Sequence, residues 1–225
     1  MPITLDGTTG ITAPGVTDTG NLSVTGTSTL TGSIGNITAG TINSGAITSS
    51  GLVTGTTGAL YPIVSGTSQA STSGTSITFT GIPSWVKRIT VMLNGVSVTG
   101  SSYVLVQIGS GSTTTSGYVG SGTNTGTGLA ASIYTVSYTN AFGMSASSPG
   151  TGNYSIIGTL VNISGNNWIW SCVGNDGGTA VGLMGAGKIA LGGVLDRVVF
   201  AASTSSSTMS GTDTYDAGSI NIMYE

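Results

Sequence analysis

The stretch that most constrains this chain is its first sixty residues, from Ile3 to Leu60. It consists almost entirely of Gly, Ser, Thr and Ala, with one isolated aliphatic residue every five or six positions. A period near five fits neither the 3.6-residue repeat of a helix nor the alternation of a strand. A single copy would bury about one side chain per turn, and ~0.8 kcal/mol per buried methylene does not offset ~1–2 kcal/mol of backbone entropy per residue. One copy alone is therefore not expected to fold here.

Several identical chains wound together change this balance, because each aliphatic side chain then meets its own copies on a common axis. Backbone groups can also pair between the chains. We therefore expect an intertwined, β-rich shaft of three chains over residues 21–62. A flexible Gly/Ser/Thr linker is the alternative, and the regular placement of Ile and Leu speaks against it. The expected core positions of the trimeric shaft are Leu22, Leu30, Ile37, Ile42, Ile47 and Leu52.

Residues 1–20 differ from the shaft because they contain Pro2 and Pro14 and two of the seven acidic residues. An irregular start of this kind suits a segment that docks on another protein, although a frayed terminus explains it equally well. The residues expected to make that attachment are Ile3, Leu5 and Ile11.

The composition is charge-poor and excludes several classes of partner. Only 5% of the 225 residues are charged, 38% are hydrophobic, and the net charge is -3. No Lys or Arg precedes Lys87, so a basic surface for nucleic acid or for anionic membranes is not expected. No apolar run approaches the ~18 residues of a membrane span, and the first residues lack the features of a signal peptide.

Cys172 is the single cysteine, which excludes an internal disulfide, and we expect it to be buried on a strand.

From Ile77 onward the pattern changes to the alternation typical of half-buried strands. Residues 63–76 are expected to form a polar joint, and residues 77–225 an antiparallel β-sandwich knob of jelly-roll type. The fold class is therefore all-β. Asn94-Gly95 predicts a hairpin turn, and residues 110–128 are expected to be a long loop. The expected strands are 76–80, 86–93, 96–98, 103–108, 133–138, 154–163, 168–173, 187–191, 194–202 and 219–224.

The motifs that could support catalysis are weak. The chain has no histidine, which removes the commonest general base and the usual zinc ligands. Residues 182–188 fit the start of a phosphate-binding loop, but Ile189 replaces the hydroxyl ligand for Mg²⁺ and a strand follows. We interpret this segment as a glycine-rich turn. Asp213 and Asp216 are interpreted as turn-forming residues. We therefore expect no enzymatic activity, no cofactor and no metal site.

The aromatic residues suggest a glycan-binding surface. Trp168 and Trp170 are expected to face opposite ways, one into the core and one outward. Aromatic faces among hydroxyl and amide groups suit sugars. Packing of these rings in the core or between subunits is the alternative. The candidate glycan-binding residues are Tyr118, Tyr138, Phe142, Trp168, Trp170 and Tyr215.

Three parts of the chain resemble bacteriophage tail-fibre-like proteins. They are the Ile/Leu-punctuated Gly/Thr-rich shaft, the phrase at residues 79–90 and the ending at residues 216–225. The resemblance implies a homotrimer in the virion, anchored through its amino end to a tail or capsid protein. It also implies a β knob that adsorbs to host surface polysaccharide or lipopolysaccharide. A capsid head fibre or decoration protein with an auxiliary role in adsorption is the alternative. A depolymerase is a third possibility, against which the lack of histidine and the few acidic residues argue.

Overall fold

The structure is a computed structural model that describes residues 53–55, 58–60, 62–126, 134–146, 153–177, 181–206 and 211–225. The chain divides into two units, residues 1–50 and 51–225, and every described residue belongs to the second. The residues predicted for the shaft core and for virion attachment all lie outside the described part of the chain.

The described residues form strands and no helix, so the all-β class is confirmed. Strands β1 (Val53–Gly55) and β2 (Gly58–Leu60) pair with each other within one chain. The remaining strands are β3 (Val64–Ser65), β4 (Gln69–Ala70), β5 (Ser76–Thr80), β6 (Arg88–Val98), β7 (Tyr103–Ser110), β8 (Ser112–Thr113), β9 (Val119–Gly126), β10 (Tyr134–Tyr138), β11 (Phe142–Gly143), β12 (Tyr154–Ser164), β13 (Asn167–Asp176), β14 (Val181–Ala190), β15 (Arg197–Ser203) and β16 (Tyr215–Tyr224).

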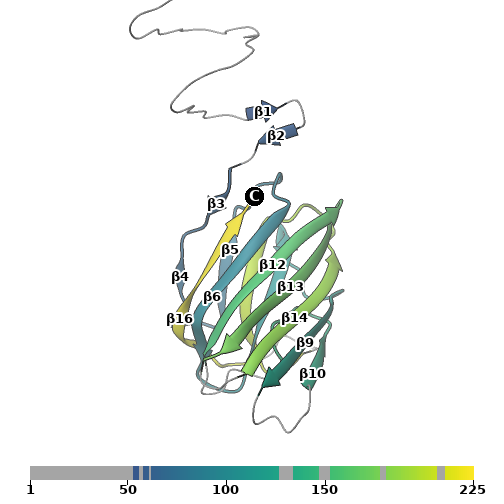
Figure 1. The fold of residues 1–225 in the computed structure, drawn as a ribbon. Helices are drawn as coiled ribbons and strands as arrows, with labels where there is room; N and C mark the ends of the chain where they lie inside the picture. Colours follow the sequence, from purple (N-terminus) through teal and green to yellow (C-terminus); the bar gives the residue numbers. More distant parts are fainter. Residues whose placement is uncertain are drawn as a thin grey trace, which may run out of the picture. The chain divides into compact units, whose positions relative to one another are not determined.

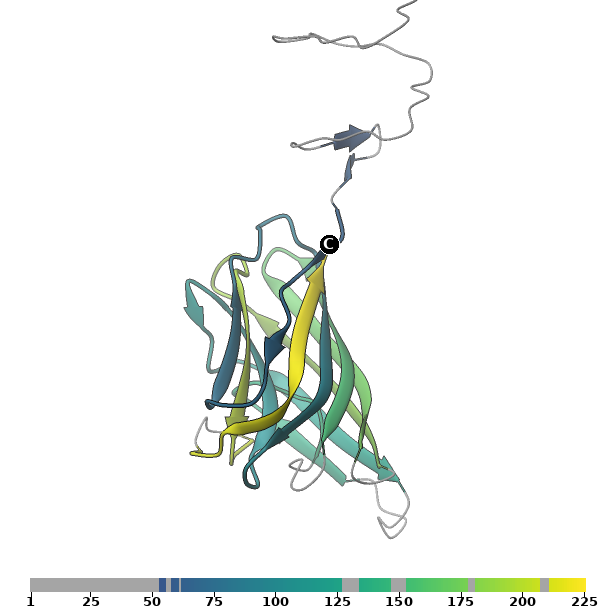
Figure 2. The ribbon, with the colours of Figure 1, turned by 90° about the vertical axis from the view of Figure 1, so that its left-hand side faces the viewer.

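Two antiparallel sheets form the body of residues 62–225, which we call the two-sheet domain. The large sheet has nine strands in the order β10-β9-β14-β13-β12-β6-β16-β3, and β4 also pairs with β16. The small sheet has five strands in the order β11-β7-β15-β5, and β8 pairs with β7. The large sheet faces the viewer in Figure 1, and Figure 2, turned by 90°, shows the two sheets side by side with the small sheet on the left.

The core lies between the two sheets and follows from the alternation of the strands. In β5 and β13 every second side chain is buried, as expected for strands with one face on a core. The large sheet contributes side chains such as Val91 and Leu160, and the small sheet contributes Val106 and Phe200, all to one continuous cluster. Burial of these aliphatic and aromatic side chains is the main stabilising term of the domain.

The predicted hairpin at Asn94-Gly95 is wrong, because β6 runs through this position without turning. Gly95 has a φ of 63°, a left-handed conformation that glycine adopts without steric cost. The pairing of β6 with both β12 and β16 shifts register here, which marks a β-bulge. Since β6 has a partner on each side, this turn-forming pair produces a bulge within the strand instead of a hairpin.

The long loop predicted over residues 110–128 contains two strands, β8 and β9. β9 pairs along its length with β14 on one side and with β10 on the other. Its sequence is Gly, Ser, Thr and Asn after Val119, so it lacks the apolar alternation by which strands are recognised. Its partners, and not its own side chains, make it a strand.

The glycine-rich segment 182–188 is not a turn but the middle of β14. A Cβ at Gly185 would lie well inside van der Waals contact with the Gly143 carbonyl oxygen and 2.9 Å from the Cys172 Sγ. A Cβ at Gly187 would lie 2.7 Å from the ring of Phe142. These glycines are therefore needed because β11 of the small sheet approaches β14 closely.

The stretch 63–76, predicted to be a joint outside the knob, supplies two short strands to the large sheet. β3 and β4 both pair with β16, the last strand of the chain. Between them, the Gly66 amide donates a hydrogen bond to the Ile222 carbonyl oxygen at 2.7 Å. The two-sheet domain therefore begins earlier in the chain than its alternating pattern does.

Candidate interaction surface

The six rings proposed to bind glycan are all buried in the two-sheet domain. Trp168 is 3% exposed and Trp170 is fully buried. Both face the core, and the expectation that one of them faces outward is wrong, because residues two apart on a strand share a face. The other four are at most 2% exposed, so none of the six rings presents a face to a sugar: Tyr118, Tyr138, Phe142 and Tyr215.

These rings organise the core instead. The Trp170 indole stacks on Phe142 with ring centroids 6.0 Å apart, and its Nε1 donates to the Gly143 carbonyl oxygen at 3.0 Å. The Tyr118 hydroxyl accepts a hydrogen bond from the Ile108 amide at 2.9 Å and donates to the Thr114 carbonyl oxygen at 3.0 Å. Burial raises the pKa of the Tyr118 and Tyr138 hydroxyls above the ordinary tyrosine value. Both hydroxyls therefore stay neutral and structural at physiological pH.

Cys172 is buried on a strand, as predicted: it lies on β13, and 9% of its surface is exposed. Burial raises the pKa of its thiol to about 12. Since the thiolate is the nucleophile, this cysteine is chemically inert near neutral pH.

Several charged side chains of the described residues form local hydrogen-bonded pairs. The Asp213 carboxylate accepts hydrogen bonds from the amide and hydroxyl of Ser102, at 2.9 and 2.8 Å. The Arg197 guanidinium donates to the Asp196 carboxylate at 2.8 Å and lowers the pKa of that carboxyl. In the described part of the chain, no three His, Cys, Asp or Glu residues come close enough together to hold a metal ion.

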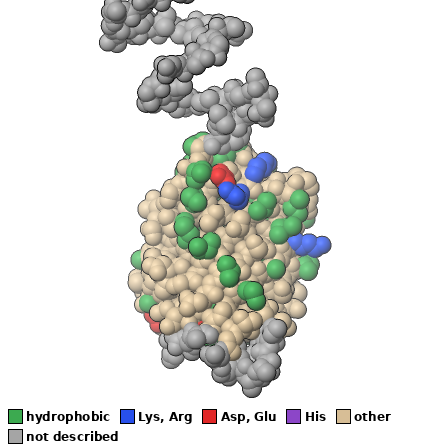
Figure 3. Space-filling model, in the orientation of Figure 1, with side chains coloured by type: hydrophobic (Ala, Val, Ile, Leu, Met, Phe, Trp, Pro, Cys, Tyr) green, Lys and Arg blue, Asp and Glu red, His purple; other side chains and the backbone are tan. Residues whose placement is uncertain are grey.

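The most unusual surface of the domain is the outer face of the large sheet. Seven of the nine large hydrophobic side chains that are exposed among the described residues gather there, on β9, β12, β13 and β14. Figure 3 shows this face with its scattered hydrophobic groups, and with a few charged groups near its upper part and its right edge. The seven residues are Val119, Ile157, Val161, Ile163, Ile169, Val173 and Met184.

The strand registers arrange most of these side chains in rows that run across the strands. The first apolar row follows the pairings Ile157–Val173–Met184. The second apolar row follows Val161–Ile169–Lys188–Val119. Between them lies a hydroxyl row, Thr159–Ser171–Ala186–Ser121. We call the surface formed by these three rows the outer face.

The outer face carries little charge. Lys188, in the second apolar row, has no ion-pair partner among the described residues. Arg88, opposite Val161 on β6, pairs with the Glu225 carboxylate. No carboxylate projects from this face of β9, β12, β13 or β14, since the single acidic residue of these strands, Asp176, is buried.

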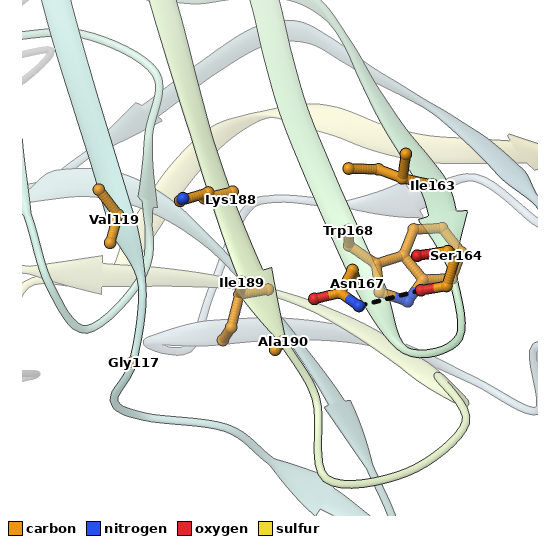
Figure 4. A pocket seen from close by; sticks show the side chains of 9 residues that line it. All are labelled: Gly117, Val119, Ile163, Ser164, Asn167, Trp168, Lys188, Ile189 and Ala190. Atoms are coloured by element: carbon orange, nitrogen blue, oxygen red, sulfur yellow. Dashed lines mark hydrogen bonds between the residues drawn. The ribbon is translucent and has the colours of Figure 1, made fainter.

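Shallow hollows follow the outer face. One of about 450 Å³ lies between Val119, Lys188, Ile163 and Asn167 (Figure 4). In it, the Asn167 side-chain nitrogen donates to the Ser164 carbonyl oxygen at 3.1 Å. Two further hollows, of about 430 and 370 Å³, continue along β9, β13 and β14 toward Val173 and Met184. The outer face is therefore uneven.

A separate pocket of about 420 Å³ opens at the side of the domain, between β5 and the β3–β4 segment. Its wall includes Tyr224 and Thr80, and the Gln69 side-chain nitrogen crosses it to donate to the Thr78 carbonyl oxygen at 2.9 Å. Tyr224 is half-buried and lies against Trp85, with ring centroids 6.0 Å apart. We call this the side pocket.

The sequence contains a signal for the outer face. Residues 154–163 carry aliphatic side chains at both odd and even positions, which is typical of a strand covered on both sides. No such signal exists for the side pocket, because its walls come from residues 66–69 and 78–82 together with Ile222 and Tyr224 near the end of the sequence.

Comparison with known proteins found no match to this chain among family models, curated proteins or solved structures. None of the described residues belongs to a helix that is long and apolar enough to span a membrane.

Proposed function

We propose that this chain is a structural subunit of a homotrimeric bacteriophage virion fibre. Residues 1–20 attach to a tail or capsid protein, residues 21–62 form the intertwined shaft, and the two-sheet domain is the jelly-roll-like knob. The knob adsorbs to host surface polysaccharide or lipopolysaccharide and performs no catalysis.

The observation that carries this proposal is the exposed apolar outer face. Exposed apolar side chains that gather on one face mark interaction sites, whereas singly scattered ones are ordinary. Here seven of the nine exposed large hydrophobic side chains among the described residues lie on one sheet face, and Ile157, Val173 and Met184 are neighbours across its strands. Lys188 is the one charge without an ion-pair partner in the three rows. Joined to a segment whose aliphatic rhythm cannot be buried in one copy, such a domain suits a component of an assembly.

The side pocket supports the adsorption part of the proposal. Neutral sugars bind where an aromatic ring lies among hydroxyl and amide groups. The side pocket combines Tyr224 with the hydroxyls of Thr67, Thr78 and Thr80 and the amide of Gln69. Many weak contacts of this kind on one particle give strong adsorption through avidity.

We expect the variant Tyr224→Ala to adsorb host cells at least about tenfold more weakly, because stacking on one ring contributes on the order of 1–1.5 kcal/mol per contact and several copies act together. The measurement is competition: purified full-length protein is added in excess to phage, and the rate of adsorption is followed. Wild-type protein should slow adsorption, and the variant should not.

Tyr103→Ala is the matched control for this substitution. Tyr103 is also half-buried and also lies against another aromatic ring, Tyr138, at 5.9 Å between centroids. It should compete as well as the wild type. Equal competition by all three proteins would show that the side pocket is not the glycan-binding site. If the wild-type protein did not compete, this chain would not be the one that adsorbs to the host.

The fibre proposal itself is tested by mass and by location. Sedimentation equilibrium of the full-length protein should give three times the mass of one 22.0 kDa chain. Antibody labelling of particles should place the protein at the tail for a tail fibre, or over the shell for the alternative of a capsid head fibre. A monomer in solution, or particles without label, would contradict the proposal.

A further inference from the structure

We propose that the outer face is the surface through which the two-sheet domains of neighbouring copies pack together. This inference rests on the proposed homotrimer and names the surface that its knobs share. The chain itself is the partner, so the occupant of the outer face is a second copy.

The first step is that the outer face needs a partner. Ile157 and Val173 are 60% and 63% exposed, and Val119 is 63% exposed. The pairing of the strands places Ile157 beside Val173 and Val173 beside Met184, so these three side chains are neighbours across three strands. Removing their exposed parts from water is favourable, at ~25 cal/mol for each Å² of apolar surface.

The second step concerns the chemistry of that partner. A strongly charged protein or an acidic polymer gains little here, because Lys188 is the one unpaired charge in the three rows. A glycan would lack an aromatic platform, since the rows contain only aliphatic, hydroxyl and lysine side chains. What remains is a surface that is itself charge-poor and aliphatic.

The third step is that the outer face complements itself. In a closed trimer each copy meets two neighbours, one on each side of its outer face. Hydroxyl groups donate and accept hydrogen bonds, so Thr159, Ser171 and Ser121 can bond to the hydroxyl groups of either neighbour. The apolar rows can likewise lie against the apolar rows of either neighbour. With a net charge of only -3 per chain, the copies repel each other weakly.

The fourth step concerns the effective concentration of the knobs around one another. A shaft that holds three chains together would keep their knobs at an effective concentration in the millimolar range. Under that condition even an interface that is too weak to form between free domains stays closed. The outer face therefore does not need the large buried area of an interface between independent proteins.

The test measures access to the outer face in the full-length protein. Ser171, in the hydroxyl row, is exposed in one copy, and so is Ser76 on β5 of the small sheet. Ser171→Cys and Ser76→Cys are labelled with a maleimide at neutral pH. The wild-type protein provides the baseline, because its buried Cys172 should react slowly. We expect Ser171→Cys to react at least about tenfold more slowly than Ser76→Cys, and equally fast after unfolding.

A second pair of variants identifies what protects the outer face. Val173 is 63% exposed in the first apolar row, and Val194 is 54% exposed outside the three rows. Val173→Glu puts a short charged side chain into the first apolar row, where no basic side chain lies, so it should restore fast labelling of Ser171→Cys. Lys188 of the second apolar row differs because its long stem lets the ammonium group reach water. Val194→Glu should leave the labelling rate unchanged.

The outcomes separate this inference from the fibre proposal. A trimer in which Ser171→Cys reacts as fast as Ser76→Cys overturns the inference and leaves the fibre proposal standing. A trimer in which Val173→Glu leaves Ser171→Cys protected also overturns it, because something other than packing between the copies would then cover this face. A monomer overturns both.

Discussion

Replacing Trp170 with alanine should lower the free energy of unfolding of the two-sheet domain by about 3–5 kcal/mol. The Trp170 side chain is fully buried, and its indole stacks on Phe142 and donates a hydrogen bond to Gly143. The ring also fills the space left by Gly158, where a Cβ would overlap the indole. The substitution therefore leaves a large cavity and removes a hydrogen-bond donor from the Gly143 carbonyl oxygen. Urea unfolding followed by far-ultraviolet circular dichroism measures the loss.

Trp85→Ala is the control for this prediction. Trp85 is half-buried and packs at the border of the core, against Tyr224. Its truncation removes a comparable ring with less burial, so the expected loss is smaller, on the order of 1–2 kcal/mol. Equal losses for the two variants would show that Trp170 is not the centre of the packing between the sheets.

The second large effect is expected for Gly185→Ala, which should destabilise the domain by about 1–3 kcal/mol or more. A methyl group at this position meets the Gly143 carbonyl oxygen and the Cys172 Sγ. The carbonyl oxygen belongs to the backbone of β11 and cannot rotate away like a side chain, so β11 and β14 must move apart. A lower midpoint of thermal unfolding is the expected result.

Gly192→Ala tests whether the effect of Gly185→Ala comes from this close approach. A Cβ at Gly192 meets no atom within 4 Å, and the residue does not adopt a left-handed conformation. It should be neutral or stabilising by up to about 1 kcal/mol, because alanine restricts the unfolded chain. Similar destabilisation by both substitutions would show that general backbone effects, and not contact between the sheets, dominate at Gly185.

The sequence predicts those strands of the fold whose own side chains alternate. The strand expected at residues 76–80 is β5, and that expected at 154–163 is β12 with one residue added. The strands that could not be recognised obtain their stability from partners. β9 is a strand because β14 and β10 flank it, and β3 is a strand because the end of the chain lies beside it.

The candidate sites were harder to predict than the strands, since exposure depends on the opposite sheet. Tyr118 lies just before β9, in a segment rich in Gly, Ser and Thr that suggests an exposed loop, yet its ring packs edge-on against Phe142, 4.9 Å between centroids. For Trp168 and Trp170 the information was present in their spacing of two residues, which places both on one face. For the outer face, the aliphatic residues at both odd and even positions of 154–163 indicated one apolar strand, but its rows also need β9, β13 and β14, which pair with it or with one another across the sheet.

The pairing of β3 and β4 with β16 has a mechanical consequence. Any tension on the residues before Val64 enters the large sheet through the backbone hydrogen bonds of Gly66 and Ser71 with β16. β6 holds β16 along its opposite edge, so the load spreads into the middle of the large sheet. Strand β16 thus resists any pull on the residues that precede Val64.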